Sequence, residues 1–213
     1  MAKRMEKRVR SQAAEHLAFL RGFLKHPNQV GSIIPSSQFL ERRIARLAEL
    51  GRARVVVELG PGTGGTTRAI LAAMRENAKL LCIELNAQFH TLLRRIDDPR
   101  LILHLGSAGE LREAMTRHGI EGADVVISGI PFSTMSRATA SRILDAISSA
   151  LLPGGRFIAY QVRGHVETLS RPYFGPARMD VELLNIPPVR VYRWEKNAAA
   201  SPAMQQRSAA GGR

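Results

Sequence analysis

A glycine-rich segment beside an acidic residue is the strongest chemical signal in the sequence. Residues 58–64 read ELGPGTG and follow a run of three valines that predicts a short buried strand. Glycines let a backbone turn tightly and approach a ligand without interference from Cβ atoms. The spacing of Gly60, Gly62 and Gly65 also satisfies the GxGxxG pattern of nicotinamide-binding proteins. Glu58 favours a different ligand, because its carboxylate would face a pyrophosphate, whereas S-adenosylmethionine has no phosphate and carries an ammonium group at its methionine end.

A second acidic residue, Glu84, ends the apolar run 80–84. A carboxylate at the end of a second strand can accept hydrogen bonds from both ribose hydroxyls of a nucleoside cofactor. The alternative is that Glu58 and Glu84 are surface carboxylates that happen to end strands. As a pair they favour S-adenosylmethionine as the cofactor, and Cys82 is interpreted as a small core residue and not as a catalytic one.

The elements that would position these residues alternate regularly, which predicts a doubly wound, mostly parallel α/β sheet. A helix over 37–50, capped by Ser36 or Ser37, precedes the alternation. Strands are expected at 55–57, 80–84, 101–104, 124–128 and 156–162. Helices are expected at 65–75, 87–96, 108–118 and 137–151, and a closing pair of strands at 181–186 and 189–195.

Composition is that of an ordinary globular protein. The 213 residues suffice for one α/β domain, and the apolar share of 45% excludes wholesale disorder. The single cysteine cannot form an internal disulfide, which fits a reducing compartment. No cluster of Cys and His residues suggests a zinc site, so no metal is expected. No run approaches the roughly 18 to 20 apolar residues that cross a bilayer, and a signal peptide is not expected.

The net charge of +13 is unusual, and it is concentrated at the two ends of the chain. Residues 1–54 carry +8 and residues 186–213 carry +4, whereas residues 55–185 carry only +1. A basic surface favours an anionic partner, either a membrane or a nucleic acid. The surface that binds an anionic partner is therefore expected to lie in the terminal segments and not in the nearly neutral central part of the chain.

The start of the chain predicts a basic amphipathic helix that ends before Pro27. Its two faces are expected to contact a membrane through Lys3, Arg4, Lys7, Arg8 and Arg10 on the basic side and Phe19, Leu20, Phe23 and Leu24 on the apolar side. This composition is typical of a helix in the headgroup layer of an anionic membrane. Two other interpretations are open: the apolar face packs on the domain, or the segment is a transit peptide or a nucleic-acid arm.

Residues 30–195 resemble the class I S-adenosylmethionine-dependent methyltransferases, with ELGPGTG as the cofactor motif and the CIEL of residues 82–85 as the ribose motif. The segments 30–37, 185–188 and 190–194 are similar to the bacterial phospholipid N-methyltransferases, and the rRNA adenine dimethyltransferases are a second similar branch. The resemblance implies a Rossmann-like seven-stranded sheet. The cofactor residues that it implies, with those found above, are Ser32, Glu58, Gly60, Gly62, Thr63, Gly64, Glu84, Leu85, Ser107 and Ala108. The family usually has Asp-Ala where this chain has Ser107-Ala108, which leaves a weaker acceptor for the adenine amine.

The segment SGIPF, residues 128–132, begins at the end of the fourth predicted strand. It is expected to form the part of the site where the acceptor of the methyl group binds. The rRNA enzymes carry Asn at the position of Ser128, where it would bind the adenine amine, so Ser128 argues against adenine chemistry. Carbonyls around Ile130 can direct a primary amine, and Phe132 can face the methylammonium product; the alternative is a plain strand-to-helix turn. The expected catalytic residues are Ser128, Ile130, Pro131, Phe132 and Tyr160. Headgroup contacts are expected from Arg163, His165 and Tyr173, with Tyr160, His165 and Tyr173 as candidate proton acceptors and Arg163 as a partner for the lipid phosphate.

These features predict a peripheral enzyme on the cytoplasmic face of the membrane that methylates the amine of phosphatidylethanolamine, up to three times, towards phosphatidylcholine. The expected parts are a membrane-binding helix and connecting loop over 1–36, a methyltransferase domain over 37–196 and a disordered tail over 197–213. The expected partners are an anionic membrane surface and phosphatidylethanolamine, with no nucleic acid. The alternative is an rRNA adenine N6-dimethyltransferase, whose basic ends would bind phosphates.

Overall fold

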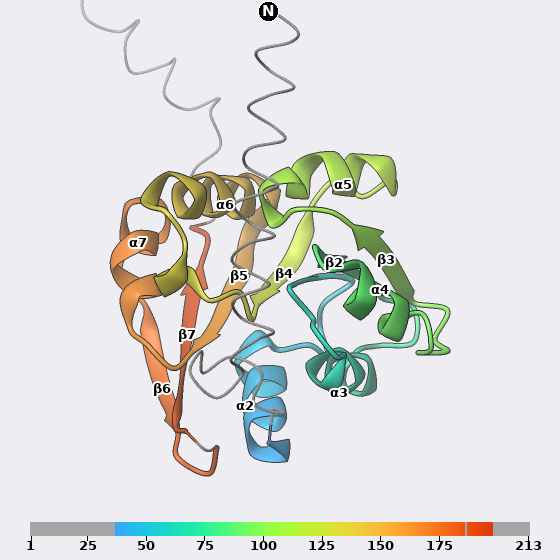
Figure 1. The fold of residues 1–213 in the computed structure, drawn as a ribbon, viewed down its shortest axis with the longest axis horizontal. Helices are drawn as coiled ribbons and strands as arrows, with labels where there is room; N and C mark the ends of the chain where they lie inside the picture. Colours follow the sequence, from blue (N-terminus) through green and yellow to red (C-terminus); the bar gives the residue numbers. More distant parts are fainter. Residues whose placement is uncertain (1–36, 186, 198–213) are drawn as a thin grey trace, which may run out of the picture. The chain divides into compact units, whose positions relative to one another are not determined.

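The computed structural model describes residues 37–185 and 187–197, in which helices cover both faces of one sheet (Figure 1). The helices are α2 (Gln38–Ala48), α3 (Gly65–Ala73), α4 (Ala87–Leu93), α5 (Leu111–Arg117), α6 (Arg137–Ala150) and α7 (His165–Phe174), with short 3-10 helices η1 (Ala108–Glu110) and η2 (Phe132–Thr134). The strands are β1 (Val55–Leu59), β2 (Lys79–Glu84), β3 (Leu101–Leu105), β4 (Ala123–Ser128), β5 (Leu151–Gln161), β6 (Arg178–Glu182) and β7 (Val189–Glu195). The helix and membrane contacts predicted within 1–36 and the cofactor contact predicted for Ser32 lie outside the described residues. So does the tail predicted over 197–213, except for its first residue.

The seven strands form one sheet in the order β3-β2-β1-β4-β5-β7-β6. The strands from β3 to β5 are parallel, β7 is antiparallel to β5, and β6 is antiparallel to β7. Figure 1 shows β3 and β6 at opposite ends of the sheet. The order reverses between β1 and β4, and ligands of open α/β sheets bind at the carboxyl ends of strands beside such a switch point. The predicted doubly wound, mostly parallel, Rossmann-like sheet is confirmed.

Two apolar cores fill the space between the sheet and its helices. The first core joins α5, α6 and α7 to one face, where Phe157 and Trp194 stack with ring centroids 5.0 Å apart. The second joins α2 and α3 to the other face, and Leu40, Ile44 and Ala48 of α2 are buried in it. The i, i+4 spacing of these three residues puts them on one side of the helix. Each helical layer is therefore held to the sheet by apolar burial.

The start of the described chain lies beside the end of β6. Helix α2 is capped by Ser37, whose hydroxyl accepts from the N–H of Leu40. The closing strand pair is confirmed, but its first strand ends at Glu182 and does not reach residue 186. The strand ends early because the N–H of Leu184 donates to the Glu182 carboxylate and the side chain of Asn185 accepts from the N–H of Ser37. Side-chain bonds of this kind compete with the strand ladder.

None of the helices in residues 37–185 and 187–197 is both long and apolar enough to cross a membrane.

Candidate active site

The predicted cofactor and substrate segments lie side by side at the carboxyl edge of the sheet. Leu59, the last residue of β1, pairs with Ile83 on one side and with Ser128 on the other. The N–H of Gly60 donates to the Ile83 carbonyl, and the N–H of Gly129 donates to the Leu59 carbonyl. These bonds hold the glycine segment after β1 against the turn after β4.

Gly60 and Gly64 have backbone conformations that favour glycine, with φ of 71° and 83°. A Cβ at Gly60 would lie 3.0 Å from the side chain of Ile130, and a Cβ at Gly64 would lie 2.9 Å from the side chain of Leu93. The glycine segment can therefore stay close to its neighbours and present backbone to a ligand.

Glu58 is fully buried between β1 and α3. Its Oε2 accepts a hydrogen bond from Thr67 Oγ1 at 2.7 Å and one from Cys82 Sγ at 3.3 Å, whereas its Oε1 has no partner among the described residues. Burial raises the pKa of Glu58 from an ordinary 4.5 to about 7, the Thr67 and Cys82 bonds oppose the rise, and the charge of Glu84 adds to it. An unpartnered carboxylate oxygen in an apolar setting attracts a cationic group.

Glu84 is nearly buried at the end of β2. Its Oε2 accepts from the N–H of Gly62 at 3.0 Å, and its Oε1 accepts from the N–H of Asn86 at 2.8 Å. Burial raises the pKa of Glu84, and the backbone hydrogen bonds oppose the rise. Each carboxylate oxygen keeps a second lone pair, so Glu84 can tie the glycine segment to β2 and still accept ligand hydroxyls. Of the other predicted cofactor residues, Leu85 is half-buried and Thr63 is exposed.

Ser107 caps the short helix η1 after β3. Its hydroxyl accepts from the N–H of Gly109 at 3.2 Å, and the Glu110 carboxylate accepts from the Ser107 N–H in return. The Ser107 oxygen keeps one lone pair for a further donor. Ala108 is buried in the first core and contributes no polar group there.

The turn after β4 corrects two expectations. Ser128 is fully buried, and its Oγ accepts from the N–H of Ile130 at 3.2 Å, so its hydroxyl shapes the turn and does not face a substrate. Phe132 is 1% exposed and packs in the first core, so its ring has no free face for a methylammonium group. Ile130 and Pro131 are half-buried, and the Ile130 carbonyl accepts a hydrogen bond from Gln161 Nε2. Gln161 thus fixes the direction of that carbonyl.

Tyr160 of β5 lies against the turn after β4. Its hydroxyl packs on Gly129 and is 3.5 Å from Thr66 Oγ1. Burial raises the pKa of Tyr160, and the negative charge of Glu58 raises it further. The raised pKa favours the protonated phenol, and the role of Tyr160 as a proton acceptor stays a prediction.

The other three candidates lie after β5. The hydroxyl of Tyr173 donates to the Ser141 carbonyl of α6 at 3.2 Å, so its proton is engaged in a hydrogen bond within the fold. Both Arg163, which follows β5, and His165, the first residue of α7, are exposed. The structure therefore brings Ile130 to the glycine segment, ties Tyr173 to α6, and leaves Arg163 and His165 at the surface beyond β5.

The sequence is 30% identical to the ornithine lipid N-methyltransferase of Singulisphaera acidiphila over 177 residues, which are 82% of this chain and 92% of that protein. The chain belongs to the class I S-adenosylmethionine-dependent methyltransferases. The predicted family is thus confirmed, and S-adenosylmethionine is the methyl donor of that family. No family model matches the sequence.

Other relatives of this methyltransferase are similar over a smaller part. The ribosomal RNA small subunit methyltransferase A of Phenylobacterium zucineum is 36% identical over 96 residues, which are 44% of this chain and 32% of that protein. Among solved structures, the 1,6-didemethyltoxoflavin-N1-methyltransferase of Burkholderia thailandensis has a TM-score of 0.63 at 19% identity, covering 86% of this chain and 90% of that one. The precorrin-6y C5,15-methyltransferase of Geobacter metallireducens has a TM-score of 0.61 at 15% identity, covering 78% and 92%. These two likenesses support the fold.

Two residues of the methyltransferase site were missed from sequence. Thr67 holds the Glu58 carboxylate, and Gln161 holds the Ile130 carbonyl. Gln161 is the last residue of β5, as Glu84 is the last residue of β2. A polar residue that closes an apolar strand was therefore the signal available for Gln161. Thr67 is one of two adjacent threonines in α3, and nothing in the pattern distinguishes it.

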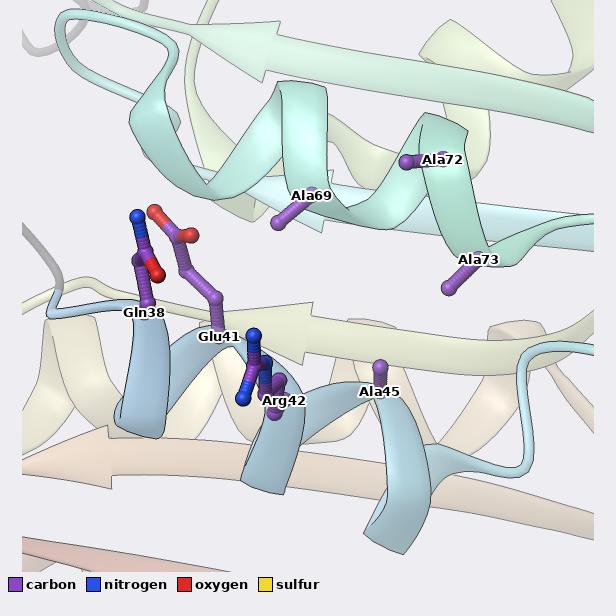
Figure 2. Close-up of a pocket in the computed structure, with 7 residues that line it drawn as sticks. All are labelled: Gln38, Glu41, Arg42, Ala45, Ala69, Ala72 and Ala73. Atoms are coloured by element: carbon purple, nitrogen blue, oxygen red, sulfur yellow. The ribbon is translucent and has the colours of Figure 1, made fainter.

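A groove lies between α2 and α3 (Figure 2). Its lining comprises Gln38, Glu41, Arg42, Ala45, Ala69, Ala72 and Ala73. None of them is among the predicted site residues of the methyltransferase. In the described part of the chain, no group of three or more Cys, His, Asp or Glu side chains is arranged to hold a metal ion.

Proposed function

We propose that this methyltransferase transfers methyl groups to the primary amine of a membrane-lipid headgroup. The observation that carries the proposal is the alignment with the S. acidiphila lipid enzyme, which covers 82% of this chain and 92% of that protein. The similarity to the P. zucineum rRNA enzyme covers 44% of this chain and 32% of that protein. Ser128, where the resemblance to the rRNA enzymes calls for Asn, also argues against adenine as the acceptor.

Three side chains are assigned to the cofactor. Bound S-adenosylmethionine supplies a methyl group on a sulfonium, which is already a good leaving group. We assign Glu58 to its ammonium group, because Glu58 Oε1 is a buried carboxylate oxygen without a partner. Glu84 is assigned to the ribose hydroxyls and Ser107 to the adenine amine, because both keep lone pairs at the same edge. These fits support the prediction of the cofactor from sequence.

The Ile130 carbonyl is assigned to the acceptor amine. Gln161 uses one lone pair of this carbonyl, and the second can accept an N–H of the amine and so direct its nitrogen. The closeness of Gly60 and Ile130 supports this, because it puts the amine beside the cofactor segment. The amine must be neutral to attack. Since the raised pKa of Tyr160 favours its protonated form, the Tyr173 hydroxyl is engaged and His165 is assigned below to the anionic group of the headgroup, we assign proton loss to bulk water.

The headgroup has two candidate identities. Phosphatidylethanolamine is favoured by the resemblance of residues 30–37 and 185–188 to phospholipid enzymes, and ornithine lipid is favoured by the name of the relative. Both carry a primary amine and an anionic group. We assign exposed Arg163 and His165 to the anionic group. We also propose that the enzyme works at the cytoplasmic face of the membrane, with the basic amphipathic segment within 1–36 in contact with anionic lipids.

Expression in a bacterial host that contains both lipids and no methylated form of either tests the proposal. Mass spectrometry of the lipid extract should find one headgroup with one, two or three added methyl groups, and the Glu84→Gln variant should give much less. Methylated phosphatidylethanolamine or methylated ornithine lipid identifies the headgroup. Unchanged lipids in cells that make the folded protein would refute a lipid substrate.

A further inference from the structure

We infer that the turn after β6 inserts into the lipid bilayer beside the active site; this rests on the proposed lipid substrate. The leucine turn, Leu183 and Leu184, carries the most exposed large apolar side chains of the described residues, at 72% and 62% exposure. Two adjacent leucines at such exposure are costly in water unless a partner covers them. The chemistry of the surroundings identifies that partner as a lipid surface.

The leucine turn lies at the same edge of the sheet as the cofactor segment. Strand β6 runs in the same direction as β5, because both are antiparallel to β7. Gln161 at the end of β5 pairs with Arg190, and Glu182 at the end of β6 pairs with Val189 one residue earlier. The turn therefore extends beyond the carboxyl ends of the strands, as the projecting loop between β6 and β7 in Figure 1 shows.

Hydrogen bonds hold the leucine turn in place. Asn185 is 2% exposed; its Oδ1 accepts from the N–H of Ser37 at 3.1 Å, and its Nδ2 donates to the Pro187 carbonyl at 3.1 Å. The N–H of Leu184 donates to Glu182, which Arg43 holds at 2.9 Å. The residues on either side of the two leucines, Glu182 and Asn185, are thus buried and hydrogen-bonded. These bonds fix the backbone of the turn so that both leucines stay exposed.

The charges around the leucine turn match an anionic membrane. Arg190 and Arg163 are exposed at this edge, and Arg190 donates to the carbonyl of the residue that follows β5. The acids of β6, Asp180 and Glu182, are both paired with Arg43, and Asp180 is also paired with Arg46. Apolar tips with arginines at headgroup level are typical of segments that insert at a membrane interface.

Two further features join the leucine turn to the start of the domain. Phe39, 50% exposed, is one helical turn before Arg43 and so lies on the side of α2 that faces β6. Ser37, bonded to Asn185, is the residue at which the segment 1–36 joins the described fold, and that segment carries seven basic and two acidic residues. A second copy of the chain fits less well, because a stable interface needs about 800 Å² per partner and this patch is a narrow tip.

A fluorescent label tests insertion directly in the full-length chain. Because Cys82 is 1% exposed, an environment-sensitive dye will react with an introduced cysteine. Leu184→Cys is the test site, and Leu152→Cys is the matched control, since Leu152 is 42% exposed at the start of β5, on the opposite edge. Vesicles of phosphatidylethanolamine and phosphatidylglycerol should shift the emission of the dye at 184 to the blue and leave the dye at 152 unchanged. Equal responses at both sites, no response at 184, or the same shift on concentrating the protein without vesicles would overturn the inference.

A second measurement separates this inference from the proposed function. The double variant Leu183→Glu/Leu184→Glu should methylate vesicle lipid about tenfold more slowly or worse, because two apolar anchors become charges. The same lipid dispersed in detergent micelles should be methylated within about twofold of the wild-type rate, and Leu152→Glu should behave as wild type in both. Equal vesicle activity of the double variant and the wild type would overturn membrane insertion and leave the lipid substrate standing. A blue shift at 184 with no lipid methylated at all would support insertion and refute the substrate.

Discussion

The Glu58→Gln substitution removes one buried ionisation and should change stability and cofactor affinity in opposite directions. Burial raises the pKa of Glu58 from 4.5 to about 7 in the folded protein, which corresponds to about 3 kcal/mol against the ionised form. Between these two pH values the folded chain holds a proton that the unfolded chain has lost, so the free energy of unfolding falls as the pH rises. In the variant, residue 58 has no ionisable group, so this decrease in the free energy of unfolding is absent. Its stability relative to the wild type should therefore increase by about 3 kcal/mol between about pH 4.5 and 7.5.

Cofactor binding should respond to the same ionisation. An ammonium group favours the ionised carboxylate, so binding below about pH 7 requires Glu58 to release its proton, and the wild-type Kd for S-adenosylmethionine should rise about tenfold per pH unit below that value. In the variant the Kd should be independent of pH in this range. Near about pH 7.5 it should exceed the wild-type value about tenfold to a hundredfold, because a hydrogen bond to a charged group is lost.

Titration calorimetry between about pH 5.5 and 7.5 measures both effects. The range stops there because an α-amino group titrates at about 7.7 to 8.0, and the cofactor must keep its ammonium group. Urea unfolding over the same range gives the stability. Adenosine, which has no ammonium group, is the control ligand and should bind the wild type and the variant equally. A variant that kept the wild-type pH dependence of S-adenosylmethionine binding would refute the role assigned to Glu58.

Three further substitutions test other parts of the site and its frame. Gly60→Ala should lower the free energy of unfolding by about 1 to 2 kcal/mol, because φ is 71° there, and an unchanged urea midpoint would contradict this. Arg43→Ala should cost about 2 to 3 kcal/mol by leaving the buried Glu182 carboxylate without its 2.9 Å partner, whereas the exposed Arg46→Ala should cost less than about 0.5 kcal/mol; equal losses in urea unfolding would argue against the ion pair. The Arg43 bond lowers the pKa of Glu182, so this difference should disappear as the pH falls through that lowered value. Glu84→Gln should weaken the binding of both adenosine and S-adenosylmethionine about tenfold in calorimetry, and unchanged adenosine binding would exclude Glu84 from the ribose.

The order of strands and helices was predictable because it depends on local patterns. Short apolar runs alternate with amphipathic stretches, and each change of period marks an element. The end of β6 was not predictable, because Leu184 and Asn185 leave the ladder for bonds to Glu182 and to Ser37, the latter 148 residues away in the sequence. The bond between Asn185 and Ser37 is tertiary, so it leaves no local pattern by which the end of the strand could be recognised.

The candidate site was predictable to a similar degree. Glu58 and Glu84 could be identified because an acid that closes an apolar strand is a local signal. Their burial and the orphaned Oε1 of Glu58 depend on α3 and β2 packing around them. The buried positions of Ser128 and Phe132 depend on the hydrogen bond within the turn and on the first core, so their type alone suggested a substrate contact that the fold does not provide.

One competition assay decides whether the methyl group goes to a lipid amine or to RNA. Purified protein is given S-adenosylmethionine with a labelled methyl group in one tube that holds unmodified small-subunit rRNA and vesicles containing phosphatidylethanolamine and ornithine lipid. We expect label on a lipid amine, little on RNA, and much less lipid label with Glu84→Gln. Label on adenine in the RNA, with none in either lipid, would refute a lipid substrate.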